Sequence, residues 1–302
     1  SGCIIFQPSP ILRIMTRLAV LGVGRIGGEV AFLSSVLGLA DDLVLFDTAE
    51  TLLRSQVLDL IHTGLDITIS TDWRDTAEAD ICVFAAGIPR NPAVKSRADL
   101  LSVNLPVASS CSRALTRFSG VLITVTNPMD ANNYYLCRNT GLEPRQCIGF
   151  GGQIDSARFG TVLQEQGISG TPWVIGEHGE HQVPVFSRLE QDVPEPLRDD
   201  ILESLRKASM EVIRGKGGTE FGPALHIAHL IRIISGDERT LLPCSCVLEG
   251  EYGLDRCSLG VPAAVGRNGI HSISEWDLDG WEQEKFKAAG AFVTDLCTRL
   301  GI

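Results

Sequence analysis

The segment Gly176-Glu-His-Gly-Glu-His181 carries two histidines flanked by glutamates, and these residue types can transfer protons or bind a metal ion. Imidazole changes its charge near neutral pH, so His178 could act as a general acid or base. The two histidines lie three residues apart, which differs from H-E-x-x-H, and the glycines favour a loop over a helix. We therefore expect no metal ion at this segment.

A second segment, Asp155-Ser-Ala-Arg158, opens an expected helix. A guanidinium can hold a carboxylate through two parallel hydrogen bonds, so Arg158 could bind an acidic substrate. The two charged side chains are also neighbours on a helix surface, and a simple ion pair between them is the alternative.

Two further segments carry polar or charged side chains that composition alone would not require. Thr126-Asn127-Pro128 closes an expected strand at the carboxyl edge of a sheet, where open α/β folds bind ligands, although X-Pro is often only a rigid turn. The loop 86–97 contains two prolines and the cations Arg90, Lys95 and Arg97. A solvated surface loop is the alternative interpretation of these cations.

The segment Gly22-Val-Gly-Arg-Ile-Gly27 lies where an expected strand meets an expected helix. In a dinucleotide-binding turn, Gly22 permits the bend, Gly24 the approach of a pyrophosphate, and Gly27 the packing of helix on strand. Asp47 follows Gly27 by twenty residues, and a carboxylate there accepts ribose hydroxyls and repels a 2′-phosphate. The pair favours NAD over NADP. A packing turn, with Asp47 as a helix N-cap, is the alternative.

Hydrophobic periodicity indicates the elements that must position these residues. Helical spacing of apolar residues covers 26–37 and 52–61. Short apolar runs predict buried strands at 17–22, 43–46, 67–70, 81–85 and 121–125. Strands that alternate with helices require parallel pairing, so we expect an α/β fold with a doubly wound parallel Rossmann sheet.

The pattern changes past Gly149, where longer helical patterns and separate strand-like stretches predict a second, mixed α+β domain. The expected helices lie near 153–167, 196–213, 220–235 and 286–300, and the strand-like stretches near 173–175, 241–249 and 258–265. We predict an N-terminal extension with little fixed structure over 1–14, an NAD-binding Rossmann domain over 15–150 and a catalytic domain over 151–302.

Composition excludes several classes of protein. The 302 residues carry 26 Lys and Arg against 37 Asp and Glu, a net charge of −11 that argues against nucleic-acid binding. The apolar runs are too short for a membrane span. The nine cysteines are scattered without a C-x-x-C pair, which favours buried thiols in a reducing cytoplasm.

The order and spacing of the six motifs resemble the lactate/malate dehydrogenase family from about Thr16 to the C-terminus. The carrying motifs are the glycine turn, the acidic strand end, the loop with two arginines, T-N-P, D-S-A-R-F and G-x-H-G-[DE]. The resemblance implies that His178 is the acid/base residue, Asp155 its orienting partner and Arg158 the clamp for the C1 carboxylate. It places Arg97 beside the reacting carbonyl.

The resemblance also implies reversible hydride transfer between NAD and a small 2-hydroxy acid, in a homodimer or homotetramer. It places Asn127 beside substrate and nicotinamide, and family members commonly have a cis bond before the proline that corresponds to Pro128. We expect NAD to contact Gly22, Gly24, Arg25, Ile26, Gly27, Asp47, Ala86, Gly87, Asn104, Thr126 and Asn127.

Substrate choice in the family is governed chiefly at the position of Arg90. A second guanidinium can bind a second carboxylate, so the resemblance favours the malate-specific members; lactate or another 2-hydroxy acid is the alternative. Arg90 and Arg97 lie seven residues apart, one more than usual, which could bring Lys95 or Asn91 nearer to the substrate. An NAD-binding regulator without activity would have no reason to keep the four catalytic side chains together.

One further segment departs from the family pattern, and another matches it. Asp130-Ala-Asn-Asn-Tyr-Tyr is more polar than its usual aliphatic sequence, which puts local helix packing in question. Gly218 and Thr219 match small residues of the pocket wall, and Thr219 could at the same time cap a helix.

Overall fold

The computed structural model describes residues 16–88, 96–299 and 301. The expected extension over 1–14 and the side chains of Arg90, Asn91 and Lys95 lie outside these ranges. Within them, no helix combines the length and the apolar character that crossing a membrane requires.

The first half of the chain forms a parallel sheet in the order β3-β2-β1-β4-β5-β6. Its strands are short and most of them are apolar, and β4 and β5 are buried along their whole length, as strands covered on both faces must be. They are β1 (Arg17–Leu21), β2 (Asp42–Phe46), β3 (Thr68–Ser70), β4 (Ile81–Phe84), β5 (Val121–Thr124) and β6 (Cys147–Gly149). The helices between them are α1 (Arg25–Val36), α2 (Glu50–His62), α3 (Arg97–Ala114) and α4 (Met129–Thr140), with 3-10 turns at Trp73–Glu78 and Pro144–Gln146.

The second half continues the same sheet with antiparallel strands. β6 pairs with β9 (Thr240–Glu249), and the order runs on through β10 (Asp255–Gly266), β7 (Val174–Gly176) and β8 (Gln182–Pro184), while β11 (Gly269–Ile273) pairs with β10. The helices of this half are α5 (Gly152–Glu165), α6 (Glu195–Lys216), α7 (Phe221–Gly236) and α8 (Gly280–Arg299), with a 3-10 turn at Glu251–Gly253.

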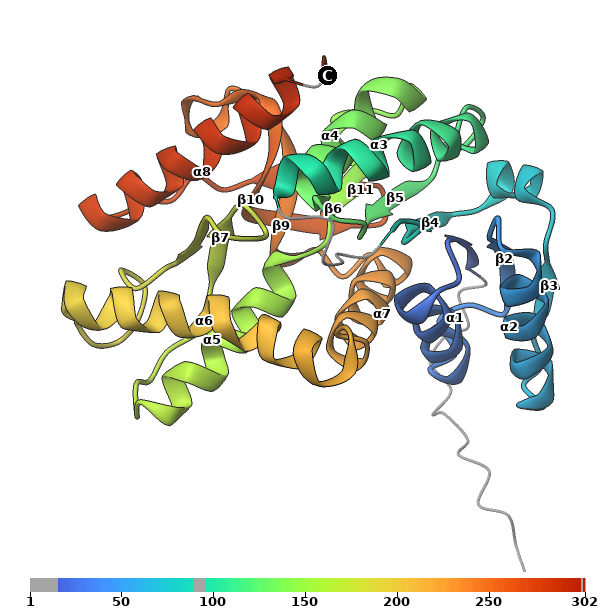
Figure 1. Ribbon diagram of the computed structural model, residues 1–302, viewed down its shortest axis with the longest axis horizontal. Coiled ribbons are helices and arrows are strands. Elements are labelled where there is room, and N and C mark those ends of the chain that lie inside the picture. Colours follow the sequence, from blue (N-terminus) through green and yellow to red (C-terminus); the bar gives the residue numbers. More distant parts are fainter. Residues whose placement is uncertain (1–15, 89–95, 300, 302) are drawn as a thin grey trace, which may run out of the picture.

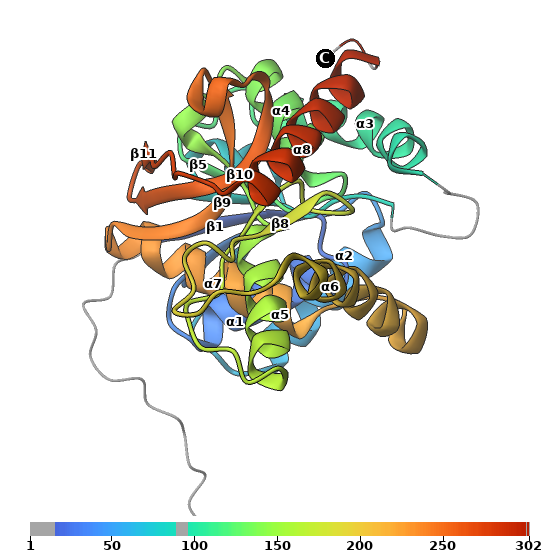
Figure 2. The same cartoon turned by 90° about the vertical axis from the view of Figure 1, so that its left-hand side faces the viewer.

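Helices cover both faces of the sheet (Figures 1 and 2). α3, α4 and α8 lie on one face, and α1, α5, α6 and α7 lie on the other. A hydrophobic core fills the space between these layers, with side chains from nearly every strand fully buried. This arrangement fixes the carboxyl ends of β4 and β5 at one edge of the sheet, where the chain leaves the core and polar side chains can meet a ligand.

The expected strands and helices of the first half agree with the structure to within one or two residues at their ends. Periodicity gave no indication of β6, β8 or β11, which are too short or too mixed to show alternation, nor of the polar helices α3 and α4. The N-cap alternatives are wrong, because α2 begins after Ala49 and not after Asp47, and α7 begins after Glu220 and not after Thr219.

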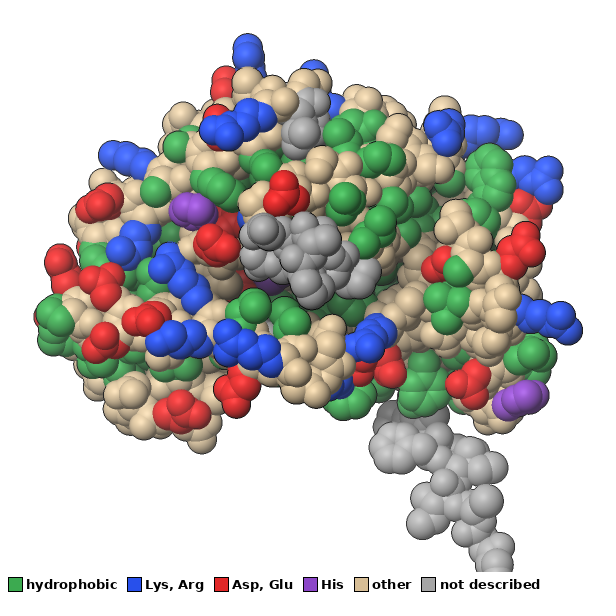
Figure 3. Space-filling view, in the orientation of Figure 1, with side chains coloured by type: hydrophobic (Ala, Val, Ile, Leu, Met, Phe, Trp, Pro, Cys, Tyr) green, Lys and Arg blue, Asp and Glu red, His purple; other side chains and the backbone are tan. Residues whose placement is uncertain are grey.

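Charged side chains of both signs are interspersed on the face shown in Figure 3.

The eight cysteines within the described part of the chain are buried and unpaired, and burial raises the pKa of several of them, for example Cys244 to about 12. Thiols of this kind behave as small apolar core residues.

Candidate active site

Four segments that are distant in sequence meet at one edge of the sheet. The ends of β4 and β5 lead into residues 86–88 and 126–128, α5 begins nearby at Gly152, and the β7–β8 connection carries His178. Because parallel strands end at the same edge, the sheet brings these segments together. The expected catalytic side chains within the described ranges therefore share one site.

His178 and Asp155 form the central pair of this site. Nδ1 of the imidazole lies 2.6 Å from Oδ2 of Asp155, whose side chain is 2 % exposed. An ionised carboxylate only accepts hydrogen bonds, so the pair favours the tautomer with hydrogen on Nδ1 and leaves Nε2 to act on a substrate. Gly151 permits this contact, because a Cβ atom there would clash with the imidazole ring.

Arg158 completes the group from the same helix as Asp155. Its Nη1 donates to Oδ1 of Asp155 at 3.0 Å, and its side chain is 19 % exposed. Both the catalytic and the ion-pair interpretations of the segment are therefore compatible with the geometry. The pair with Asp155 holds the guanidinium within reach of the imidazole and leaves other N–H groups to bind a carboxylate.

Opposing effects set the protonation of His178. Burial disfavours the charged imidazole, but the charge and hydrogen bond of Asp155 more than offset burial and raise the pKa of His178 above its ordinary value. Arg97 lowers this pKa and Asp130 raises it. These contacts therefore favour the imidazolium more than the environment of a free histidine does, which suits a group that could donate a proton.

Arg97 lies in the site at the start of α3. Its Nη1 donates to Oδ1 of Asn127 at 3.2 Å and its Nη2 to the carbonyl oxygen of His178 at 2.9 Å. Oε1 of Glu177 lies 3.5 Å from its Nε. Ser96 caps α3 with a reciprocal bond to Asp99, which fixes where Arg97 begins the helix.

The turn after β4 is held by polar side chains that were expected to contact the coenzyme. Asn104 is buried, and its amide bonds both backbone groups of Ile88 and the carbonyl oxygen of Asn127. Thr126 donates to the carbonyl oxygen of Ala86. A Cβ at Gly87 would clash with Thr126. These contacts position the turn and Asn127, and the Asn127–Pro128 peptide bond is cis.

The glycine turn has the shape that a pyrophosphate requires. Gly22 has a φ of 92°, a Cβ at Gly27 would clash with the carbonyl oxygen of Gly22, and a Cβ at Gly24 would meet only open space. Gly24 is the N-cap of α1 without a side-chain bond, so the first N–H groups of that helix face this space. The turn therefore fits a dinucleotide.

Asp47 lies at the end of β2 beside this turn. Its two oxygens accept from the backbone N–H groups of Val23 at 3.0 Å and of Ala49 at 2.9 Å. Each carboxylate oxygen has a second lone pair for a ribose hydroxyl.

Arg25, another residue expected to contact the coenzyme, extends to the second half of the chain, where its Nη1 donates to the carbonyl oxygen of Lys216.

Sequence reasoning gave no catalytic role to two buried carboxylates beside His178. Glu177 is 3 % exposed and accepts from the backbone N–H of His181, whereas Asp130 accepts from the backbone N–H of His178 itself. Glu177 could have been found as the direct neighbour of His178, and Asp130 by its place just after T-N-P.

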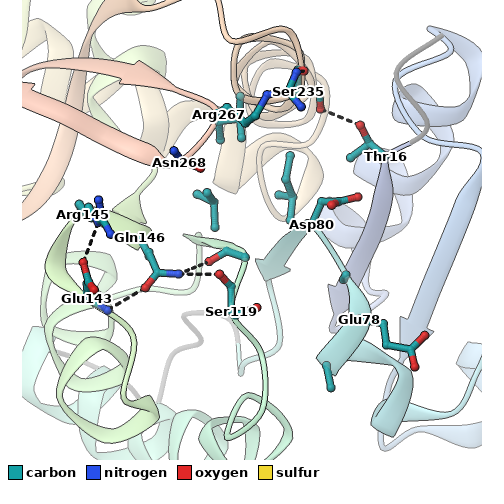
Figure 4. Close-up of a pocket in the computed structure, with 16 residues that line it drawn as sticks. Thr16, Glu78, Asp80, Ser119, Glu143, Arg145, Gln146, Ser235, Arg267 and Asn268 are labelled. Atoms are coloured by element: carbon teal, nitrogen blue, oxygen red, sulfur yellow. Dashed lines mark hydrogen bonds and ion pairs between the residues drawn. The ribbon is translucent and has the colours of Figure 1, made fainter.

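A cavity of about 720 Å³ lies at the opposite edge of the sheet, around the starts of β4, β5 and β6 (Figure 4). Several polar groups of its lining bond within the cavity wall: the side chain of Thr16 bonds that of Ser235, Arg145 pairs with Glu143, and the side chain of Gln146 bonds the backbone of Ser119 and Glu143. His178 and its partners are not part of its lining. This cavity is therefore separate from the candidate active site.

Comparison with known families gives one family for both halves of the chain. Residues 16–149 match the family description "lactate/malate dehydrogenase, NAD binding domain", and residues 153–295 match "lactate/malate dehydrogenase, alpha/beta C-terminal domain". The chain belongs to the lactate/malate dehydrogenase family. The family resemblance and the expected fold class are thereby confirmed, and so is an NAD-binding domain in the first half.

Relatives within the family extend over nearly the whole chain. The malate dehydrogenase of Natronomonas pharaonis is 36% identical over 303 residues, which cover 93% of this chain and 98% of the relative. The malate dehydrogenase of Bacillus pumilus is 35% identical over 292 residues, covering 89% of this chain and 93% of the relative.

Solved structures of the family have the same fold. The malate dehydrogenase from Archaeoglobus fulgidus in complex with NADH has a TM-score of 0.86 at 28% identity, covering 95% of this chain and 100% of that one. The lactate dehydrogenase from Cryptosporidium parvum, complexed with lactic acid and NAD, has a TM-score of 0.87 at 28% identity, covering 95% of this chain and 98% of that one.

Proposed function

We propose that this member of the lactate/malate dehydrogenase family is an NAD-dependent malate dehydrogenase that interconverts L-malate and oxaloacetate. The observation that supports the proposal most is the buried contact of Asp155 with both His178 and Arg158, because proton transfer and carboxylate binding need an imidazole and a guanidinium side by side. A 2-hydroxy acid presents the hydroxyl and the carboxylate that these two groups bind.

His178 moves the proton in this reaction. During oxidation Nε2 removes the hydroxyl proton, and during reduction the imidazolium returns it to the ketone oxygen. Asp155 holds the ring in the required tautomer and stabilises its charged form. When bound, NAD would accept the hydride that leaves C2 during oxidation, and NADH would supply the hydride to C2 during reduction.

Arg158 orients the substrate for this transfer. A bidentate grip on the C1 carboxylate fixes the position of C2 relative to His178 and to the turn after β5, where Asn127 lies. Arg97 contacts both His178 and Asn127, so its guanidinium can stabilise the negative charge that develops on the oxygen at C2. The glycine turn and Asp47 hold the pyrophosphate and the adenosine ribose.

Recognition of the second carboxylate is assigned to Arg90 on sequence grounds, because this residue lies outside the described ranges. The relatives named malate dehydrogenase support the assignment. A side chain that neutralises a second carboxylate favours oxaloacetate, whereas the methyl group of pyruvate needs no charged partner.

Steady-state oxidation of NADH with oxaloacetate and, separately, with pyruvate tests the proposal. We expect kcat/KM for oxaloacetate to exceed that for pyruvate at least ~100-fold, or about 2.7 kcal/mol, because losing a charged hydrogen-bonded partner in a closed site costs this much or more. Arg90→Gln should reduce this ratio and Lys95→Ala should leave it within a few-fold. A wild type that prefers pyruvate contradicts malate specificity and supports the lactate alternative.

We also propose that the enzyme is a homodimer or homotetramer, as the family resemblance implies. Large apolar side chains are exposed on α1, α2 and α7, which lie on the same side of the sheet (Figure 2); Ile61 is 55% exposed and Phe221 70%. Exposed apolar side chains are often covered by a second subunit. Sedimentation velocity measures the assembly, and a monomer at micromolar concentration would contradict it.

We also propose a cytoplasmic location for the enzyme. The unpaired buried cysteines of the described residues support it, because thiols stay reduced in the cytoplasm.

A further inference from the structure

A buried chain of hydrogen bonds lies directly behind His178. Oδ2 of Asp130 accepts from the backbone N–H of His178 at 2.9 Å, and its Oδ1 accepts from Oγ of Ser245 at 2.6 Å. The Ser245 and Ser258 hydroxyl oxygens are 2.8 Å apart, and Nδ2 of Asn133 donates to Ser258 at 2.9 Å. The chain thus leaves α4 at Asp130, crosses β9 and β10, and returns to α4.

This chain accounts for two of the polar residues after T-N-P, Asp130 and Asn133. Asp130 is 3 % exposed, and Asn133, Ser245 and Ser258 are at most 1 % exposed. Buried polar groups are tolerated where they bond one another, and a connected chain of them fixes the relative positions of its elements. The chain therefore ties the backbone of His178 to α4 and to two strands of the sheet.

We propose that Asp130 is a positioning residue for His178, whose carboxylate fixes the histidine backbone and, when ionised, favours the protonated imidazole. The proposal deepens the proposed function, since it assigns the control of the acid/base group in the same site. Asp130 acts through His178 and touches no reacting atom.

The charge of Asp130 depends on pH in the range where the enzyme would work. Burial, and next the charge of Glu177, raise the pKa of Asp130 to about 7, although the bonds from Ser245 and His178 oppose this. The ionised carboxylate raises the pKa of His178. The two groups therefore titrate as an interacting pair, and Asp130 supports the imidazolium most strongly above neutral pH.

Other charged or titratable groups also face Asp130 and His178, and they are the same in every variant below. They are Asp155 and Arg158 from α5, Arg97 from α3, Glu177 and His181 from the β7–β8 connection, and the thiols Cys257 of β10 and Cys297 of α8, which sense the charge of Asp130. Variants that each change one residue of the hydrogen-bond chain behind His178 leave these groups in place, so a comparison among them isolates the contribution of Asp130.

Asp130→Asn is the decisive variant because it removes the charge and retains the shape. The amide oxygen can accept from the backbone N–H of His178, and the amide nitrogen can donate to Ser245. The pKa of the His178 imidazole, followed by NMR, should fall by at least about half a unit. The ratio of variant to wild-type kcat/KM for oxaloacetate should then be near one at about pH 6, where Asp130 is mostly neutral, and at most about one third at about pH 8.5.

Two further variants separate this effect from a structural one. Ser258→Ala breaks the chain one step away and should lower the midpoint of thermal unfolding while leaving the His178 titration unchanged. Ser245→Ala removes a donor that stabilises the Asp130 carboxylate, so it should move the His178 titration in the same direction as Asp130→Asn but less far, and it serves if Asp130→Asn does not fold.

The NMR titration needs no turnover, so the inference and the proposed function fail separately. A pKa of His178 that is unchanged in Asp130→Asn, or that moves as far in Ser258→Ala, overturns the positioning role. A loss of activity that is equal at every pH also overturns it. Wild-type protein that oxidises NADH with neither 2-oxo acid contradicts the proposed function and leaves the NMR comparison to decide the role of Asp130.

Discussion

Replacing His178 with asparagine is expected to lower kcat for oxaloacetate reduction by at least ~100-fold, because general acid/base catalysis contributes about 10²–10⁴-fold. Asparagine keeps polar atoms near the Asp155 carboxylate but cannot carry a proton at neutral pH. The coenzyme contacts expected at the glycine turn and Asp47 do not involve His178, so the dissociation constant of NADH should stay within a few-fold of the wild-type value.

His181→Asn is the matched control for this variant. His181 lies in the same segment, its ring stacks on Phe292 with the two ring centroids 4.3 Å apart, and its Nδ1 lies 3.5 Å from Oε2 of Glu177. We expect its kcat to stay within a few-fold of the wild-type value. Equal losses in the two variants would point to a general disturbance of the β7–β8 connection, and a fully active His178→Asn would contradict the acid/base assignment.

Arg158→Gln is expected to reduce kcat/KM for oxaloacetate by at least ~100-fold, about 2.7 kcal/mol of transition-state stabilisation. Glutamine cannot offer two parallel charged N–H donors to the C1 carboxylate. The loss should appear in KM as well as kcat, because the carboxylate is held before and during the reaction. Steady-state kinetics with both 2-oxo acids measures it, and both substrates should be affected because both have this carboxylate.

Arg158→Lys separates charge from geometry at the same position. Lysine retains the positive charge but offers a point donor in place of the planar fork, so its activity should lie between those of Gln and Arg. An Arg158→Gln enzyme with wild-type kcat/KM would show that the carboxylate is bound elsewhere. In that event, the contact with Asp155 would be only an ion pair within α5.

The sequence predicted the parts of this fold that depend on strong periodicity. Examples are the buried strands of the parallel sheet and the glycine turn after β1. Apolar runs and turn glycines depend on residues that are neighbours in the sequence, so the sequence alone shows them. The antiparallel extension through β9 and β10 could be seen only as strand-like stretches, because pairing with β6 depends on contacts between distant segments. The division into domains near residue 150 stays a prediction.

The candidate site was predicted as residues and not as contacts. The motifs indicated His178, Asp155 and Arg158, but no spacing could show that Asn104 uses its amide on the backbone of Ile88 and Asn127. The polar side chains of α4 looked like a departure in helix packing, yet Asp130 bonds the backbone of the expected catalytic histidine. Such contacts arise from the folding of segments that are far apart in the chain.

Proton transfer by His178 is tested most directly by the pH dependence of kcat/KM in both directions of the reaction. Reduction of oxaloacetate needs the imidazolium and should fall as pH rises through the pKa of His178, whereas oxidation of malate needs the neutral ring and should rise through the same region. Because Asp155 raises this pKa, both inflections should lie above the ordinary histidine value of 6.5. Profiles that change in the same direction, or inflections below that value, would contradict His178 as the acid/base residue.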